Sequence, residues 1–198
     1  LPFTYIMIMI GSLALMGFPF LTGFYSKDVI LEIAYAKYNF IGTFAHWLGV
    51  LSASITAFYS FKLIYMTFVS NPNGFKSSMQ SVSDAPFPMA LPLFILSLGS
   101  LFLGFLTKDL FIGIGTPFWN NSIFILPEHF NMIDAEFIPI HIKWVPFFVS
   151  IFGSVLSVFL YHLFSSSLFN LYVNNKFFYY TYIFFNKKWL FDRLQNEL

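Results

Sequence analysis

The sequence predicts an all-α polytopic membrane protein, and three observations support this fold class. Hydrophobic residues make up 58% of the 198 residues, whereas charged residues make up only 10%. A soluble domain carries about 25% charged residues, so the composition excludes an ordinary soluble domain, and the many aromatic residues exclude a disordered chain. Several apolar stretches are long enough to cross a bilayer as helices, and none shows the sustained polar and apolar alternation of a membrane β-barrel.

Four apolar stretches reach the length of about 20 residues that a spanning helix needs. They cover residues 3–35, 41–69, 89–106 and 144–164. We therefore expect a transmembrane bundle over residues 1–165, followed by an interfacial segment over residues 166–198. The apolar run in that segment, residues 177–185, is too short to span, and its tyrosines suit the membrane interface.

The first stretch is too long for one straight span. A continuous helix over residues 3–35 would measure about 50 Å, whereas the bilayer core measures about 30 Å. Pro19 removes a backbone donor and clashes with the preceding turn, and Gly17 and Gly23 flank it. We therefore expect a helix that is broken between Gly17 and Gly23. Broken helices of this kind commonly mark ion-binding sites in transporters.

Three charged residues follow the predicted break, namely Lys27, Asp28 and Glu32. A charge inside a membrane is costly, so it normally faces the bundle interior and has a role. Asp28 and Glu32 share one helix face, whereas Lys27 points about 100° away from Asp28. A desolvated lysine holds its proton weakly and a nearby carboxylate strengthens that hold, so movement of the carboxylate would drive proton uptake and release. The alternative is that all three residues lie at headgroup depth and only end a straight helix.

Small residues recur at the spacing that lets helix backbones approach closely. They occur in each of the three later spans, at Gly49 and Ala53, at Ser100 and Gly104, and at Gly153 and Ser157. We expect these positions to lie at helix–helix contacts.

Three further motifs and the broken helix together carry a family resemblance. Residues 11–28, GSLALMGFPFLTGFYSKD, closely resemble the broken helix near the distal proton site in subunit 5 of NADH–ubiquinone oxidoreductase, respiratory complex I. Residues 57–62, AFYSFK, are similar to the helix that follows, where that family has a basic residue after a Tyr-Ser or Tyr-Thr pair. The segments DAPFPM at 84–89 and FNKKWLFD at 185–192 resemble the versions in plant-like mitochondria.

The resemblance covers the whole chain and implies a C-terminal portion of subunit 5, an antiporter-like bundle whose tail leads toward a lateral helix. It implies proton translocation coupled to NADH:ubiquinone electron transfer, with Lys27 as the proton-loading residue and Asp28 as its modulator. Glu32 and Lys62 are further candidates for proton transfer, and snorkelling to the headgroups is the alternative for Lys62. Residues of the family's pathway that lie in earlier helices are not in this chain, so pumping by this chain alone is not expected.

The resemblance also implies where the redox chemistry and the partners lie. No cofactor is expected on this chain, and NADH, flavin, iron–sulfur clusters and ubiquinone are expected in other subunits. The implied partners are the other membrane-arm subunits, including the adjacent antiporter-like subunit 4, a chain with the N-terminal helices of subunit 5 if the gene is split, and lipid such as cardiolipin. Basic residues place the termini and the loop at 70–87 on the matrix side of the mitochondrial inner membrane.

Two other functions stay open from the sequence. A multi-subunit cation/proton antiporter shares the broken helix, so the motif does not separate it from complex I. A mainly structural anchor for the lateral helix and for neighbouring lipid is the second alternative.

No catalytic or metal-binding group is expected. Cysteine is absent, which excludes disulfides, thiolate metal ligands and iron–sulfur ligation by cysteine. Nucleotide-binding motifs and nucleophile elbows are also absent, and a net charge of +1 gives no reason to expect nucleic acid. Five residues of a predicted solvated outer loop match no metal-ligand spacing, namely Glu128, His129, Asp134, Glu136 and His141.

The remaining polar and aromatic candidates are expected at the membrane interfaces. His46, Trp47 and His162 lie near predicted span ends, with a proton relay as the alternative role for His46. The other tryptophans suit the same aromatic belt: Trp119, Trp144 and Trp189.

Overall fold

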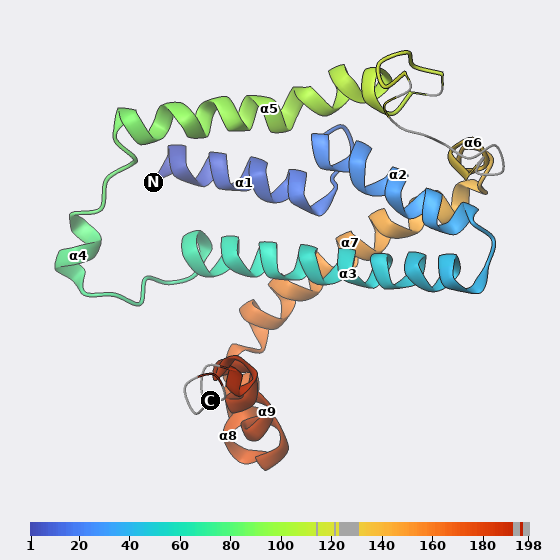
Figure 1. Ribbon diagram of the computed structural model, residues 1–198. Helices are drawn as coiled ribbons and strands as arrows, with labels where there is room; N and C mark the ends of the chain where they lie inside the picture. The colour runs from blue at the N-terminus through green and yellow to red at the C-terminus, as the bar shows by residue number, and fades with distance from the viewer. Residues whose placement is uncertain (114, 121, 123–130, 192–194, 196–198) are drawn as a thin grey trace. The chain divides into compact units, whose positions relative to one another are not determined.

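The structure, a computed structural model, describes residues 1–113, 115–120, 122, 131–191 and 195 (Figure 1). Within these residues every regular element is a helix and no β-strand occurs, so the all-α prediction is confirmed. The chain divides into two compact units, Leu1–Val158 and Phe159–Leu198.

In its described residues, the first unit contains five long or medium helices and two short ones. In chain order they are α1 (Pro2–Met16), α2 (Thr22–Ala36), α3 (Phe40–Ile64) with a π-helical turn η1 (Tyr65–Val69), α4 (Lys76–Gln80), α5 (Phe87–Phe111), α6 (Asn131–Glu136) and α7 (Ile140–Leu163), whose last turn belongs to the second unit.

Among the residues that the structure describes, three helical stretches are long and apolar enough to cross a membrane: Phe40–Val69, Phe87–Phe111 and Ile140–Leu163. They agree with the second, third and fourth predicted spans, with ends that differ by at most five residues. Local chemistry explains where two of them begin. The Asn39 side chain caps α3 by accepting a 2.8 Å hydrogen bond from the Gly42 N–H, and α5 has Pro88 in its first turn, where a missing donor costs little.

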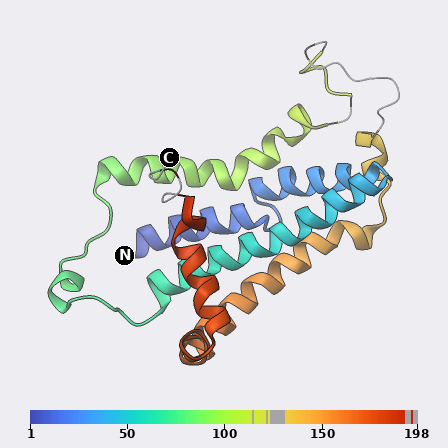
Figure 2. The same ribbon diagram turned by 60° about the horizontal axis from the view of Figure 1, so that its bottom comes forward.

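The remaining apolar stretch forms α1 and α2, which follow one another between α3 and α5 (Figures 1 and 2). Each of the two helices contacts both α3 and α5. Leu1 and α4 lie at one end of this unit, and α6 lies at the other end together with the connection from α2 to α3 (Figure 1). The unit therefore has two distinct ends, as is expected when successive helices cross a membrane in opposite directions.

Small residues mediate the closest helix contacts of the first unit. A side chain at Gly49 would overlap α2, one at Gly104 would overlap the Thr22 backbone, and one at Gly153 would overlap the Ser54 carbonyl. These glycines belong to the three small-residue pairs in the sequence, and their predicted place at helix contacts is confirmed.

The second unit contains the end of α7, α8 (Ser165–Asn174), α9 (Lys176–Asn186) and a short 3-10 turn η2 (Lys188–Leu190). α8 packs against α9. Phe177, Tyr180 and Trp189 of this unit are exposed. Its placement at the membrane interface stays a prediction.

Candidate functional site

The first helix, α1, is stopped by the glycine that follows it. Gly17 adopts the left-handed backbone conformation, with a φ of 82°, which favours glycine and stops α1 at Met16. The Phe18 N–H then donates a 3.0 Å hydrogen bond back to the Leu13 carbonyl, which satisfies one of the terminal carbonyls of α1.

The second helix begins beside the end of the first. Pro19 lies in the connecting segment, and α2 starts at Thr22. A Cβ atom at Gly23 would overlap the Ala14 carbonyl, so only glycine allows the first turn of α2 to lie against the last turn of α1. The three residues that the sequence singled out, Gly17, Pro19 and Gly23, thus lie at or beside the interruption between the two helices.

The Lys27 side chain folds back toward this interruption. Its ammonium nitrogen donates to the Met16 carbonyl at 3.2 Å and to the Thr56 hydroxyl at 3.4 Å. Its Cδ atom lies 3.3 Å from the point that a Cβ on Gly17 would occupy, so a side chain there would crowd the lysine stem. The Met16 carbonyl belongs to the C-terminal turn of α1, where the helix dipole concentrates partial negative charge. The ammonium is therefore held by the end of one helix and by a hydroxyl of another.

Thr56 is a partner of Lys27 that the sequence analysis missed. Its hydroxyl donates a 2.8 Å hydrogen bond to the Ala53 carbonyl, which leaves its oxygen free to accept from Lys27. Gly49, Ala53, Thr56 and Ser60 recur along α3 at helical spacing. This stripe of small and polar residues is the signal that would have pointed to Thr56.

Asp28 and Glu32 both line one cavity of about 240 Å³, as their spacing of four residues predicts. A cavity of this size holds several water molecules. Its other lining residues are mostly aromatic, together with one lysine: Phe24, Tyr25, Val29, Lys143, Trp144 and Phe147. The Lys27 ammonium contacts the α1 terminus and α3, so Lys27 and Asp28 point to different surroundings, also as predicted.

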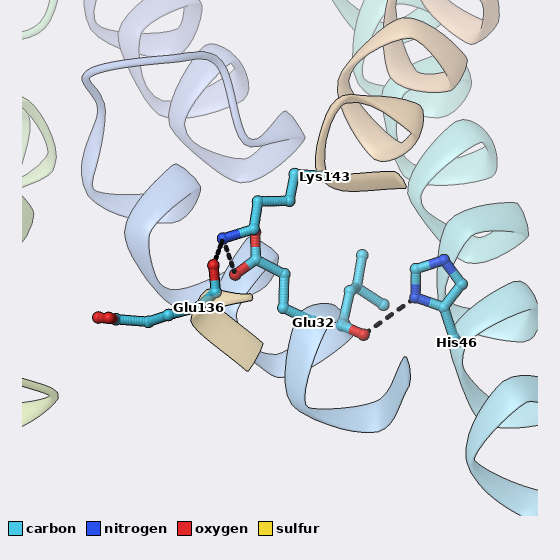
Figure 3. Close-up of polar contacts among 5 residues, drawn as sticks. Glu32, His46, Glu136 and Lys143 are labelled. Carbon is cyan, nitrogen blue, oxygen red and sulfur yellow. Dashed lines mark hydrogen bonds and ion pairs between the residues drawn. The ribbon is translucent and has the colours of Figure 1, made fainter. Parts of the chain in front are cut away.

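Lys143 brings a cation to the cavity, close to Glu32 (Figure 3). Its ammonium lies 3.8 Å from a carboxylate oxygen of Glu32 and donates a 3.1 Å hydrogen bond to the backbone carbonyl of Glu136, at the end of α6. The Glu136 carboxylate points away from this contact (Figure 3). The side chains of Lys143 and Glu32 are 29% and 20% exposed, so the pair is partly shielded from solvent. No spacing in the sequence signals this pair, because its members lie in different helices.

His46 is buried, and its predicted place in the interfacial belt is wrong. It is 1% exposed, and its Nδ1 donates to the Leu31 carbonyl at 2.9 Å, because a carbonyl can only accept (Figure 3). Its Nε2 has no hydrogen-bond partner within the described part of the chain. The adjacent Trp47 is 57% exposed, because neighbouring residues of a helix face different directions.

Lys62 lies in the last turn of α3, about 9 Å further along the helix axis than Thr56. Its role in proton transfer stays a prediction. His162 lies in the last turn of α7 and is exposed.

The candidate metal ligands fall into two groups. Glu128 and His129 lie outside the described residues. Among the residues that the structure does describe, which include Asp134, Glu136 and His141, no three carboxylate or histidine side chains gather as a metal site would require.

Comparison with protein families links the site to one group of membrane proteins. The transmembrane family of NADH:quinone oxidoreductases and Mrp antiporters matches residues 1–56. This match contains α1, α2 and α3 as far as Thr56, and therefore both sides of the Lys27 contact.

Individual relatives match the whole chain. It is 48% identical over 197 residues to NADH-ubiquinone oxidoreductase chain 5 of Phytophthora infestans and 48% identical over 198 residues to the protein of that name from Marchantia polymorpha. The Arabidopsis thaliana protein of the same name is 46% identical over 197 residues. The alignments cover 99–100% of this chain but only 29–30% of the relatives, so the chain spans less than a third of their length. The resemblance inferred from the motifs is thus confirmed, and from end to end this chain is similar to part of NADH-ubiquinone oxidoreductase chain 5.

Proposed function

We propose that the chain is a proton-translocating segment of the membrane arm of respiratory complex I, with Lys27 as the residue that loads and releases the proton. The contact of the Lys27 ammonium with the α1 terminus and the Thr56 hydroxyl carries this proposal. The Lys27 ammonium meets a helix C-terminus that favours its charged form, and the next residue, Asp28, lines a cavity with room for water.

In this proposal α1 and α2 form one broken span. Each has 15 residues, or about 22 Å, and is too short to cross a core of about 30 Å alone. Taken in series between α3 and α5 they are long enough, which gives four spans with the three long helices. The interruption is then tolerated at membrane depth because Lys27, α3 and α5 surround it with polar partners.

The geometry indicates how Lys27 could change its protonation state. The charged ammonium is favoured by the Met16 carbonyl and by the adjacent Asp28 carboxylate. After loss of the proton, the neutral amine can accept a hydrogen bond, and the Thr56 hydroxyl can rotate from the Ala53 carbonyl to donate it. Thr56 can thus hydrogen-bond both the charged ammonium and the neutral amine of Lys27. Movement of Asp28 toward Lys27 would favour the charged form, and movement away would favour the neutral form.

The proposed setting follows the resemblance. The chain would lie in the mitochondrial inner membrane with its termini and the loop at 70–87 on the matrix side. NADH, flavin, iron–sulfur clusters and ubiquinone would be bound by other subunits. The partners would be the other membrane-arm subunits, including subunit 4, a chain that supplies the N-terminal helices if the gene is split, and cardiolipin-type lipid.

The decisive test is Lys27→Ala in the assembled complex. We expect NADH oxidation with an ionophore present to continue, while the number of protons pumped per two electrons falls, because the amine that carries the proton is gone. The measurement combines NADH oxidation with proton uptake in sealed vesicles, and Lys37→Met at the exposed C-terminus of α2 is the control. An unchanged proton-to-electron ratio in Lys27→Ala would refute the role of Lys27.

The same experiment separates the alternative functions. A structural anchor predicts that Lys27→Ala changes the amount of assembled complex on a native gel and leaves the proton-to-electron ratio intact. A cation/proton antiporter remains a second candidate because the matching family includes Mrp antiporters. It predicts that the purified chain brings with it no quinone-reducing activity, whereas the complex I assignment predicts that it does.

A further inference from the structure

The cavity beside Asp28 has a second charged boundary that the proposed chemistry of Lys27 does not use. At this boundary the Lys143 ammonium lies between the Glu32 carboxylate and the Glu136 backbone carbonyl (Figure 3). Glu32 lies five residues beyond Lys27, or about 7.5 Å further along α2 toward the end of the unit where α6 lies. The pair is thus displaced from Lys27 toward one surface of the bundle.

We propose that Glu32 and Lys143 form a second proton-transfer station between Lys27 and the α6 end of the bundle, with Glu32 as the proton carrier and Lys143 as its positioning residue. This inference rests on the proposed function. It assigns a role to Lys143, which no motif or spacing in the sequence singles out.

Three observations support the station. The first is continuity, because Asp28, Glu32 and Lys143 line the same cavity and that cavity has room for several water molecules. The second is partial exposure, because neither side chain of the pair is fully buried within the chain, as a group that passes a proton outward needs. The third is that Lys143 is held from two sides, by a carboxylate of α2 and by a carbonyl at the end of α6.

The surrounding residues explain why the water path would stay narrow. The rings of Phe24, Tyr25, Trp144 and Phe147 form most of the remaining wall of the cavity. Apolar walls exclude ions and leave the carboxylates as the groups able to accept a proton. A proton that leaves the Lys27 ammonium would therefore pass by Asp28 and cavity water to Glu32.

The transfer step conserves protons. Glu32 accepts one proton from cavity water and becomes a neutral acid, which removes its attraction for Lys143. Lys143 keeps its own proton and its hydrogen bond to the Glu136 carbonyl, so it moves away from Glu32 without entering lipid. Glu32 then releases the proton to water at the α6 side, and the ion pair forms again. The pair would thus open only while Glu32 holds a proton.

The test uses the assembled complex and four variants of the pair. Glu32→Gln removes the proton carrier with little change of shape, and Lys143→Met removes the cation while keeping a long side chain. We expect both to lower the proton-to-electron ratio to the level of Lys27→Ala, while NADH oxidation with an ionophore stays at the wild-type rate. Lys143→Arg should restore the wild-type ratio, because it keeps the charge. The double variant Glu32→Gln/Lys143→Met should be no worse than either single variant, because the two residues act as a unit.

The outcomes separate this inference from the function on which it rests. If Lys27→Ala lowers the ratio and Glu32→Gln leaves it unchanged, the station is refuted and the role of Lys27 stands. If neither variant changes the ratio, the proposed function itself fails. If Lys143→Met does not assemble, Glu32→Gln alone decides, because it is nearly isosteric. Lys37→Met, a lysine outside the cavity lining, controls for loss of positive charge on this part of the bundle.

Discussion

One hydroxyl group, that of Thr22, sets the position of α2 against α5. It donates a 3.0 Å hydrogen bond to the Gly99 carbonyl and accepts a 2.9 Å hydrogen bond from the Gly104 N–H. The hydroxyl therefore bonds two backbone groups of α5 that lie five residues apart in the sequence. Because Thr22 is the first residue of α2, these bonds also fix the position along α5 at which the helix that carries Lys27 begins.

Replacing Thr22 by Val should loosen this junction. The variant keeps the shape of the side chain but loses both hydrogen bonds, and we expect a loss of about 1 kcal/mol in the free energy of unfolding. Thermal unfolding of the detergent-solubilised complex measures the loss. Thr22→Ser keeps the hydroxyl and should remain close to the wild type. Equal stability of the Val and Ser variants would contradict the role of the hydroxyl.

Thr56→Val should slow proton pumping without weakening assembly. The variant removes the only hydroxyl that contacts Lys27 in the described structure, so the neutral amine loses its hydrogen-bond donor. We expect a lower initial rate of proton uptake in sealed vesicles, and recovery in Thr56→Ser. Thr43→Val is the matched control, because Thr43 lies on the same helix and its hydroxyl bonds only the backbone carbonyl of Asn39 in the described structure. Equal effects at both positions would show that the change is not specific to Lys27.

At the scale of single elements, the sequence determines helix ends better than helix partners. The end of α1 follows from Gly17, whose left-handed conformation is a local property of the chain. The lengths of α3, α5 and α7 follow from continuous apolar composition in the same way. These features could be predicted because each depends on residues that are close in sequence.

The composition of the site could be predicted only in part. Lys27, Asp28 and Glu32 share one helix, so their spacing already indicates which of them share a face. Thr56 and Lys143 reach the site from other helices, and the burial of His46 depends on which face of α3 meets α2. Such contacts are set by tertiary packing, which periodicity within one segment does not determine.

Gly23→Ala should disturb the junction between α1 and α2. Its added methyl group would overlap the Ala14 carbonyl and push the first turn of α2 away, at a cost of about 1–3 kcal/mol. We expect less assembled complex on a native gel and a lower proton-to-electron ratio, because Lys27 moves with α2. Gly11→Ala is the matched control, since nothing lies within 4 Å of the point where its methyl group would be. A Gly23→Ala variant as abundant and active as Gly11→Ala would refute the close approach.

At the scale of the whole molecule, large apolar side chains face outward on the long helices. On α5 the exposed large apolar side chains include Phe94, Ile95, Leu96, Phe102 and Leu103. A surface of this kind is covered by lipid or by other subunits in a membrane, and in water it would drive association. The apolar side chains on these helix faces are thus available to contact the surroundings instead of being buried within the chain.

The absence of cysteine makes the orientation of the chain directly testable. We expect Phe137→Cys, at the α6 end, to react with a membrane-impermeant maleimide in intact mitoplasts. Ser77→Cys in α4 should react only after the membrane is permeabilised, because the distribution of basic residues predicts that its loop lies on the matrix side. Both positions are exposed. Labelling of Ser77→Cys in sealed mitoplasts would reverse the proposed orientation.

The ion pair between Glu32 and Lys143 joins the early and late parts of the chain. A ribosome that delivers the protein from its N-terminus therefore inserts the acid well before its cation exists. Until α7 is made, this region of the nascent bundle carries an excess of negative charge, and α7 removes that excess on docking. The contact between α2 and α7 through this ion pair can therefore form only after α7 has been made.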